Sequence, residues 1–172
     1  AGLHYLQLLY NRSASLEKRA SARWQLNRRN TLSAGYGEHS QVQPLGVYFA
    51  KVKGADGAIT YPNKDLGLTK ARHYVLSWQH FFHSKLALKA EAYYQQLHGV
   101  PVSSYDTSTL STLNIASEYV TDPLVNKGSG RNYGLELSLE RYLDRRFYYT
   151  ISTSIYQSKY KALDGVERNT RF

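Results

Sequence analysis

Apolar and polar residues alternate along three stretches of the chain, 16–26, 86–94 and 133–140. In each stretch one set of alternate positions carries mainly Leu, Ala, Tyr or Trp, and the other carries mainly Glu, Lys, Arg, Ser or Gln. Lys18 interrupts the first stretch. Because successive side chains of a β-strand point to opposite faces, the pattern predicts three strands with one apolar and one polar face each.

Four further segments show weaker strand signals. Residues 31–37, 74–82 and 147–158 alternate with lower contrast, and residues 3–10 carry apolar side chains on both faces. The sequence thus predicts about seven strands, most of about 9 to 14 residues. Strands of soluble proteins average about five or six residues, whereas a tilted strand needs about 9 to 11 to cross a membrane. We therefore predict an all-β fold, an antiparallel meander of about seven long strands that forms a fragment of a transmembrane β-barrel.

The links between these strands are of two kinds. Tight turns are expected at 27–30, 83–84 and 143–146, and long links at 41–68 and 99–131. Because short and long links alternate, every tight turn should lie at one end of the sheet and most of the irregular chain at the other. Bacterial outer-membrane barrels have this asymmetry, with short periplasmic turns and long extracellular loops.

Aromatic side chains are frequent, with 16 Tyr, 5 Phe and 2 Trp among the 172 residues. Those near the tight turns predict one interfacial girdle, made of Trp24, Trp78, Phe81, Phe82, Tyr142, Phe147 and Tyr148. Those near the long links predict a second girdle, made of Tyr36, Tyr94, Tyr133, Tyr156 and Tyr160. The alternative is that these rings form the core of a soluble β-sandwich.

The alternation also assigns a face to each charged or apolar strand residue. In a barrel the polar face lines the lumen, and the candidates are Glu17, Arg19, Arg23, Lys89, Glu91, Glu136 and Glu140. The apolar face meets lipid, and the candidates are Leu86, Leu88, Leu135, Leu137 and Leu139. We expect the carboxylates to form ion pairs with Arg19, Arg23, Lys85 or Lys89. In a soluble enzyme a facing carboxylate pair would instead do acid–base work.

Composition narrows the class of protein further. Mean hydropathy is −0.52, and no stretch approaches the roughly 18 to 20 consecutive apolar residues of a membrane helix. The net charge of +9 invites a nucleic-acid hypothesis, but the basic residues are scattered or lie in expected turns, so we expect no nucleic-acid partner. The first residues lack the basic and apolar regions of a signal peptide, which suggests a mature chain or an excerpt.

Sites for metals, phosphates or covalent catalysis find little support. Cysteine is absent, and the six His residues form no His-Glu-x-x-His motif, so we expect no metal and no cofactor. The glycines of segment 128–134 lack the Gly-Lys-Ser/Thr ending of a phosphate loop, and we expect them to let a loop turn into a strand. No nucleophile–base pair stands out, so we do not expect an enzyme.

A series of short motifs points to a family. They are GYGEHSQ (35–41), QPL (43–45), VYF (47–49), YPNKDL (61–66), KA (70–71), HYVL (73–76), KAEAYYQ (89–95), VPV (100–102), GSGRNYGLEL (128–137), SKY (158–160) and RNTRF (168–172). In this order they resemble the barrel of TonB-dependent outer-membrane receptors, in the branch that often carries an N-terminal carboxypeptidase-regulatory-like domain. The resemblance covers nearly the whole chain.

The resemblance implies a barrel of about 22 strands with an N-terminal plug, located in the outer membrane of a Gram-negative bacterium. Such a receptor takes up a scarce substrate, for example a small molecule, a glycan or a peptide, with energy transmitted by TonB. Residues 1–172 would be a single segment of the barrel, without the plug that contacts the TonB complex and without the remaining strands. Its partners would be outer-membrane lipid, the TonB complex through the missing plug, and the substrate. The alternative function is a soluble β-sheet ligand-binding module with recognition loops 41–68 and 99–131.

Overall fold

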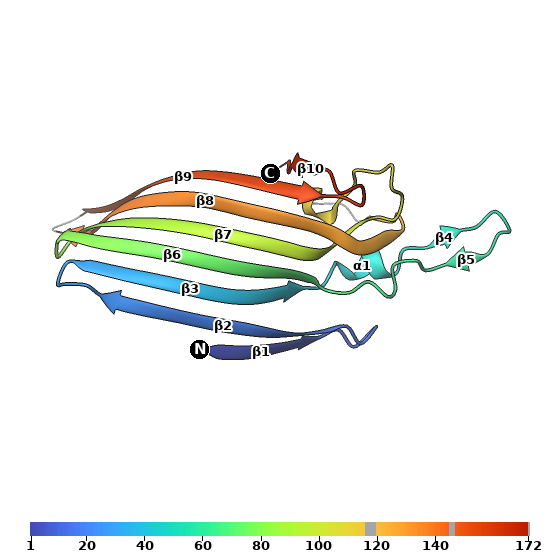
Figure 1. The fold of residues 1–172 in the computed structure, drawn as a ribbon, viewed down its shortest axis with the longest axis horizontal. Helices are drawn as coiled ribbons and strands as arrows, with labels where there is room; N and C mark the ends of the chain where they lie inside the picture. Colours follow the sequence, from blue (N-terminus) through green and yellow to red (C-terminus); the bar gives the residue numbers. More distant parts are fainter. Residues whose placement is uncertain (116–119, 145–146, 172) are drawn as a thin grey trace.

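The computed structural model describes residues 1–115, 120–144 and 147–171. It contains one antiparallel sheet of eight strands in which every strand pairs with its neighbours in the order of the chain (Figure 1). The strands are β1 (Gly2–Gln7), β2 (Ala14–Gln25), β3 (Asn30–Gln41), β6 (Thr69–His83), β7 (Leu86–Ser103), β8 (Leu124–Asp144), β9 (Phe147–Lys161) and β10 (Glu167–Asn169). The predicted all-β meander is confirmed.

Three small elements and one short strand escaped the sequence analysis. Between β3 and β6 lie the helix α1 (Leu45–Tyr48) and a separate hairpin of β4 (Val52–Lys53) and β5 (Ile59–Thr60). The 3₁₀ turn η1 (Thr112–Asn114) lies between β7 and β8, and β10 has only three residues. Elements this short do not contain enough residues for a repeating pattern of apolar positions to be recognised.

The four longest strands, β6 to β9, are consecutive in the sheet. β6 and β9 have 15 residues each, β7 has 18 and β8 has 21, all beyond the roughly 9 to 11 that a membrane crossing requires. The surplus of β7 and β8 lies at the end that carries α1 and the β4–β5 hairpin (Figure 1), which we call the loop end. The wall of the sheet therefore continues past the length of a membrane span.

The predicted link 99–131 is too wide, because β7 continues to Ser103 and β8 already begins at Leu124. Glycine and proline often end a strand, but in the structure Gly99 and Pro101 both lie within β7, at local irregularities in its pairing with β8. The register of β7 against β8 shifts between His98 and Val100 and again between Val100 and Val102. Gly99 has a φ of 63°, a conformation that glycine adopts without strain and that is common at bulges.

The distribution of turns is less regular than predicted. The links 26–29 and 84–85 lie at the end opposite the loop end (Figure 1), whereas the third predicted turn, 143–146, includes residues outside the described part of the chain. The links 8–13 and 162–166, which join the outermost strands, are short but lie at the loop end. The alternation of short and long links therefore holds for the central strands and fails at the two edges.

Most buried apolar side chains gather at the loop end, with Ala87 on β7 as an exception at the opposite end. The described residues of this cluster are Val47, Tyr48, Leu66, Val120 and Leu124, with Leu8, Leu110 and Ile115 packed against them. Along the strands, by contrast, large apolar side chains are exposed: Leu76 by 52%, Leu135 by 47% and Ile155 by 78%. Among the described residues nothing forms a layer over this apolar face of the sheet.

The glycines of segment 128–134 also differ from expectation, because they lie inside β8 and not at its start. A Cβ atom on Gly128 would come within 2.8 Å of the Val100 carbonyl oxygen and closer still to Cγ1 of Val102. Glycine at 128 thus makes room for the bulged part of β7, where the backbone approaches closely.

We predict that Gly128→Ala lowers the free energy of unfolding of the full-length protein by about 1–3 kcal/mol, because the added methyl group collides with backbone and with Val102. Chemical denaturation in detergent measures the change. Gly35→Ala is the matched control, since nothing lies within 4 Å of the Cβ position at Gly35. Equal losses for both variants would contradict the packing argument.

Candidate functional site

Cross-strand pairing aligns the alternating residues into rows that run across the sheet. One complete row over six strands is Ala22, Ala34, Leu76, Ala92, Leu135 and Ile155. The next is Trp24, Leu32, Trp78, Ala90, Leu137 and Thr153, followed by Leu88, Leu139 and Ile151 on β7–β9. None of these side chains is charged, and we call this side of the sheet the apolar face. It contains all five Leu residues that the sequence assigns to lipid, with Leu86 opposite Arg141.

A row of tyrosines borders the apolar rows toward the loop end. Tyr36, Tyr74, Tyr94 and Tyr133 are direct cross-strand neighbours on β3, β6, β7 and β8. The ring centroids of Tyr36 and Tyr74 are 5.2 Å apart, and those of Tyr74 and Tyr94 are 6.3 Å apart. The hydroxyl of Tyr133 donates a hydrogen bond to the side chain of Gln157, which ends the row on β9.

The two predicted aromatic girdles are partly wrong, because some of their residues lie on the opposite face of the sheet and one tyrosine was left out. At the loop end Tyr156 pairs with Gly134 and Tyr160 with Gly130, which puts both rings on the opposite face from the tyrosine row, and Tyr74 was overlooked. At the other end Phe81 pairs with Ala87 on the polar face, whereas Trp24, Trp78 and Phe82 follow the apolar face. The prediction failed because it used distance from the turns and ignored the parity of each position.

The polar face contains all seven residues that the sequence assigns to a lumen: Glu17, Arg19, Arg23, Lys89, Glu91, Glu136 and Glu140. Two ion pairs form there, Arg19 Nη2 to Glu17 Oε2 at 2.8 Å and Lys89 Nζ to Glu91 Oε2 at 2.8 Å. Glu140 accepts a hydrogen bond of 3.1 Å from the hydroxyl of Tyr142. Glu91 and Glu136 are direct cross-strand neighbours.

Glu17 is the most buried of these groups, with 2% of its surface exposed. Its Oε2 atom also lies 3.1 Å from Nδ1 of His4, and its Oε1 atom accepts the backbone N–H of Ser40 at 2.8 Å. The paired ladder of β2 and β3 ends at Arg19 and Gly37, so beyond this point the Ser40 N–H has no backbone partner on β2. The carboxylate of Glu17 therefore replaces backbone pairing where the two strands separate.

Six polar side chains form a row across the middle of the polar face, which we call the polar track: Arg19, His39, His73, Gln95, Asn132 and Ser158. Arg19 Nη2 lies 3.3 Å from His39 Nδ1, and the rings of His39 and His73 meet edge to face at 4.8 Å. The amide nitrogen of Gln95 lies 3.0 Å from Nε2 of His73. Asn132 donates to Gln95 Oε1 at 2.6 Å, and the hydroxyl of Ser158 donates to Asn132 Oδ1 at 2.6 Å.

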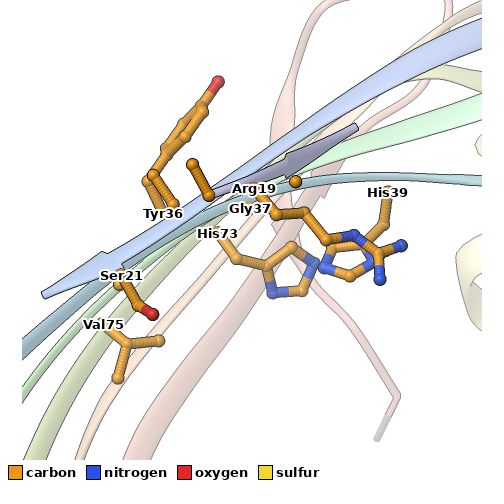
Figure 2. Close-up of a pocket in the computed structure, with 11 residues that line it drawn as sticks. Arg19, Ser21, Tyr36, Gly37, His39, His73 and Val75 are labelled. Atoms are coloured by element: carbon orange, nitrogen blue, oxygen red, sulfur yellow. The ribbon is translucent and has the colours of Figure 1, made fainter. Parts of the chain in front are cut away.

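A hollow of about 450 Å³ lies at the first part of the polar track, lined by Ser21, Gly35, Gly37 and Val75 among others. Figure 2 shows Arg19, His39 and His73 gathered on one side of the strands, with Tyr36 directed to the other side. The absence of side chains at Gly35 and Gly37 keeps the surface low here. The polar track thus borders an open depression rich in hydrogen-bonding groups.

The two long links form one packed unit at the loop end, which we call the loop cluster. Asn63 is fully buried, donates from Nδ2 to the Asp122 carbonyl at 2.9 Å and accepts the Leu124 N–H at 2.8 Å. Asn126 accepts the Gly67 N–H at 2.7 Å and donates to the Gly67 and Gly99 carbonyls. These side chains join residues that are about 60 positions apart by bonding backbone groups.

Asn11 and Tyr48 extend the loop cluster. Nδ2 of Asn11, in the link between β1 and β2, donates to the Lys64 carbonyl at 3.0 Å and to the Leu66 carbonyl at 2.7 Å. Tyr48 is fully buried, and its hydroxyl accepts the Gln43 N–H at 3.3 Å. Burial raises the pKa of Tyr48 above its ordinary value, against the opposite effect of that hydrogen bond. Tyr48 thus stays neutral at physiological pH.

Within the described ranges, the structure contains no group of three or more His, Cys, Asp or Glu residues arranged to hold a metal ion. The same part of the chain contains no helix that is both long and apolar enough to cross a membrane.

Comparison with known proteins identifies the class. A family model described as TonB dependent receptor-like, beta-barrel matches residues 11–171. The chain belongs to this family, as the sequence resemblance predicted. The proteins of this family are located in the outer membrane of Gram-negative bacteria. The narrower prediction, a branch with a carboxypeptidase-regulatory-like domain, stays a prediction.

A solved structure, the FrpB iron transporter from Neisseria meningitidis (F3-3 variant), has a similar fold, with a TM-score of 0.56 and 15% sequence identity. The similarity covers 90% of this chain and 21% of the transporter chain, so the chain spans about a fifth of the length of that structure. At this identity the similarity concerns the fold alone. No curated protein matches the sequence.

The sequence analysis missed the residues that organise the loop cluster and most of the polar track. Asn63 and Asn126 lie in segments without periodicity, and nothing in their local sequence indicates a distant backbone partner. His73, Gln95 and Asn132 were quoted only as parts of motifs. Their alignment becomes visible once the register of β6, β7 and β8 is known.

We predict that Asn63→Ala loosens the loop cluster, because it leaves the Asp122 carbonyl and the buried Leu124 N–H without their partner at a cost of about 1–3 kcal/mol each. Amide hydrogen exchange of residues 120–126 in the full-length protein should accelerate, while exchange in β6 stays slow. Asp56→Ala, at the exposed tip of the β4–β5 hairpin, is the control. Unchanged exchange at 120–126 would show that Asn63 does not hold the two links together.

Proposed function

We propose that the chain forms part of the wall of an outer-membrane transport barrel in a Gram-negative bacterium. In this proposal the apolar face meets lipid through Leu86, Leu88, Leu135, Leu137 and Leu139. The polar face lines the lumen with Glu17, Arg19, Arg23, Lys89, Glu91, Glu136 and Glu140. Residues 1–172 are then one continuous segment of the barrel, and the plug and the remaining strands belong to other parts of the receptor.

One observation carries this proposal: two complete rows of uncharged, mainly apolar side chains cross six strands on one face and end at the tyrosine row. A barrel strand in a membrane alternates apolar-out and polar-in, and aromatic residues occupy the boundary between lipid and water. From Tyr94 to Leu86 the apolar face extends about 27 Å along β7. A strand tilt of 35–45° reduces this to about 20 Å, comparable to the roughly 25 Å apolar band of such barrels.

The alternative of a soluble binding module agrees less well with the exposed apolar residues. Leu76, Leu135 and Ile155 are each about half exposed or more, and they lie in one continuous row. Soluble monomers rarely expose continuous apolar patches larger than a few hundred Å². If lipid covers the apolar face, these side chains are not exposed to water, and the free-energy cost of exposing them is removed.

Transport, and not catalysis, is the activity we propose for the complete receptor. Family membership supports energy supply by the TonB complex through a plug, and uptake of a scarce small molecule, glycan or peptide. The polar track and its hollow then offer hydrogen-bonding groups inside the lumen, where a plug or a passing substrate lies. The loop cluster forms the outer rim that a substrate meets first. The fold neighbour is an iron transporter by its title, but 15% identity carries no substrate over to this chain.

The lipid-facing assignment is tested by Leu137→Arg in the full-length receptor. We expect it to lower the free energy of unfolding in detergent or bilayers by about 2–4 kcal/mol, because it places a charge near the middle of the apolar band. Glu136→Arg is the matched control, since it introduces the same side chain one position away on the polar face beside Glu91. Glu136→Ala should likewise cost much less than Leu137→Arg.

The outcome that would contradict the barrel assignment is an equal loss of stability for the arginine variants at 136 and 137. In that case the two faces of β8 would meet similar surroundings, which a membrane barrel does not permit.

A further inference from the structure

The apolar face changes character immediately beyond the tyrosine row, toward the loop end. Two residues past Tyr74 on β6 comes Arg72, and two residues past Tyr133 on β8 comes Arg131, each on the same face as its tyrosine. The other basic residues at this distance from the tyrosine row also lie on the face that carries the tyrosines. Together they are Lys18, Lys70, Arg72, Arg131, Lys159 and Lys161, which we call the basic belt.

Two hollows open within the basic belt. The first, of about 170 Å³, is lined by Glu38, Lys70, Arg72 and His98 among others. The second, of about 220 Å³, is lined by Arg131, Lys159, Lys161 and Glu167 among others. Because β6 and β8 are separated by one strand, the backbones at Arg72 and Arg131, which share the cross-strand partner Gln96, lie about 10 Å apart, and Lys159 and Lys161 lie one strand further on β9.

The carboxylates beside the basic belt do not neutralise it. Glu38 lies 3.8 Å from Arg72 Nε and accepts the hydroxyl of Tyr36 at 2.7 Å. Glu167 is shared by Arg131, at 2.8 Å, and Lys159, at 3.5 Å. Among the residues that the structure describes, six basic groups thus face two carboxylates at this level, a formal surplus of four positive charges.

Arg168 on β10 does not belong to the basic belt. Its guanidinium makes two bonds to Asp164, of 2.6 Å and 3.0 Å, and lies on the opposite face, in register with Tyr160. The bond to Arg168 holds the pKa of Asp164 below its ordinary value, so this pair stays charged and internally satisfied. Arg168 therefore adds no charge to the basic belt.

We propose that the basic belt binds the phosphate groups of a membrane lipid whose headgroup carries two phosphates about 10 Å apart, one in each hollow. This inference rests on the proposed function, since it requires the apolar face to lie in lipid. The tyrosine row then lies at the water–lipid boundary, and the basic belt lies one step further out, at the depth of headgroup phosphates. The lipid chains cover the apolar rows below, while Arg72 and Arg131 offer forked donors that match phosphate oxygens.

The test uses the full-length receptor in detergent micelles, with lipid A as the two-phosphate probe and native mass spectrometry as the readout. Three lipids are compared: lipid A with two phosphates, its monophosphoryl form, and a form with none. The variants are Lys70→Gln with Arg72→Gln for the first hollow, Arg131→Gln with Lys159→Gln for the second, and all four together. Arg23→Gln with Lys89→Gln removes two basic groups from the polar face as the control.

We expect each double variant to weaken binding of two-phosphate lipid A about thirtyfold, and the fourfold variant about a thousandfold, since each basic group near a headgroup contributes roughly 1 kcal/mol and about 1.4 kcal/mol corresponds to a factor of ten. Removal of one phosphate from the lipid should weaken wild-type binding about tenfold. The polar-face control should bind like the wild type. Loss of heat-modifiable gel migration identifies any variant that has not folded, and the remaining double variant then supplies the result.

Three outcomes would overturn the inference: unchanged affinity in the fourfold variant, equal binding of the phosphate-free lipid, or complete displacement by millimolar inorganic phosphate, which would indicate a free anion as the ligand. The failure of the proposed function looks different. If Leu137→Arg and Glu136→Arg cost the same stability, the barrel assignment fails. If Leu137→Arg behaves as predicted while lipid binding ignores the basic belt, only the lipid site is wrong.

Discussion

The two-residue period of the β-strand is the constraint on which the rest of the structure depends. A strand must place successive side chains on opposite faces, and in lipid its backbone N–H and C=O groups must all be bonded to neighbouring strands. The alternation runs from β2 to β9, and β6, β7 and β8 are paired on both sides over most of their length, so the two complete apolar rows lie on one face and Lys89, Glu91 and Glu136 on the other. Within the described part of the chain no second layer covers the apolar face, and membrane lipid serves as the solvent for that face in the function we propose.

The register of the paired strands places equivalent positions of neighbouring strands side by side. The alternation within each strand therefore produces rows of side chains that extend across the sheet. The tyrosine row, the polar track and the basic belt each draw their members from four or more strands, and no strand contributes more than two residues to any of them. A slip of one residue between two strands would transfer half of each row to the wrong face. The bulges near Gly99 are placed above the tyrosine row, where they shift the register without disturbing the apolar rows.

Alternation alone was enough to predict the strands and the faces of residues such as Leu135, Leu137 and Glu136, because each strand repeats the pattern several times. It could not predict the extension of β7 through Pro101 to Ser103, since the bulges that accommodate Gly99 and Pro101 depend on contacts with β8. The faces of Tyr156 and Tyr160 were misjudged because proximity to a loop was given more weight than parity. The partners of Asn63 lie about 60 residues away, beyond any local signal.

The bonds of Asn63 also limit how this receptor can diversify. Asn63 contacts the carbonyl of Asp122 and the N–H of Leu124, which are main-chain groups that any non-proline residue at 124, and any residue at 122, would supply. The exposed side chain at position 122 can therefore drift during evolution without breaking the joint, whereas position 124 stays apolar because Leu124 packs in the buried cluster, and position 63 requires an amide of the same length. Related receptors that keep this joint should retain asparagine at 63 and vary at exposed positions such as 122, so in the function we propose the rim can change its ligand contacts while the scaffold that supports it stays the same.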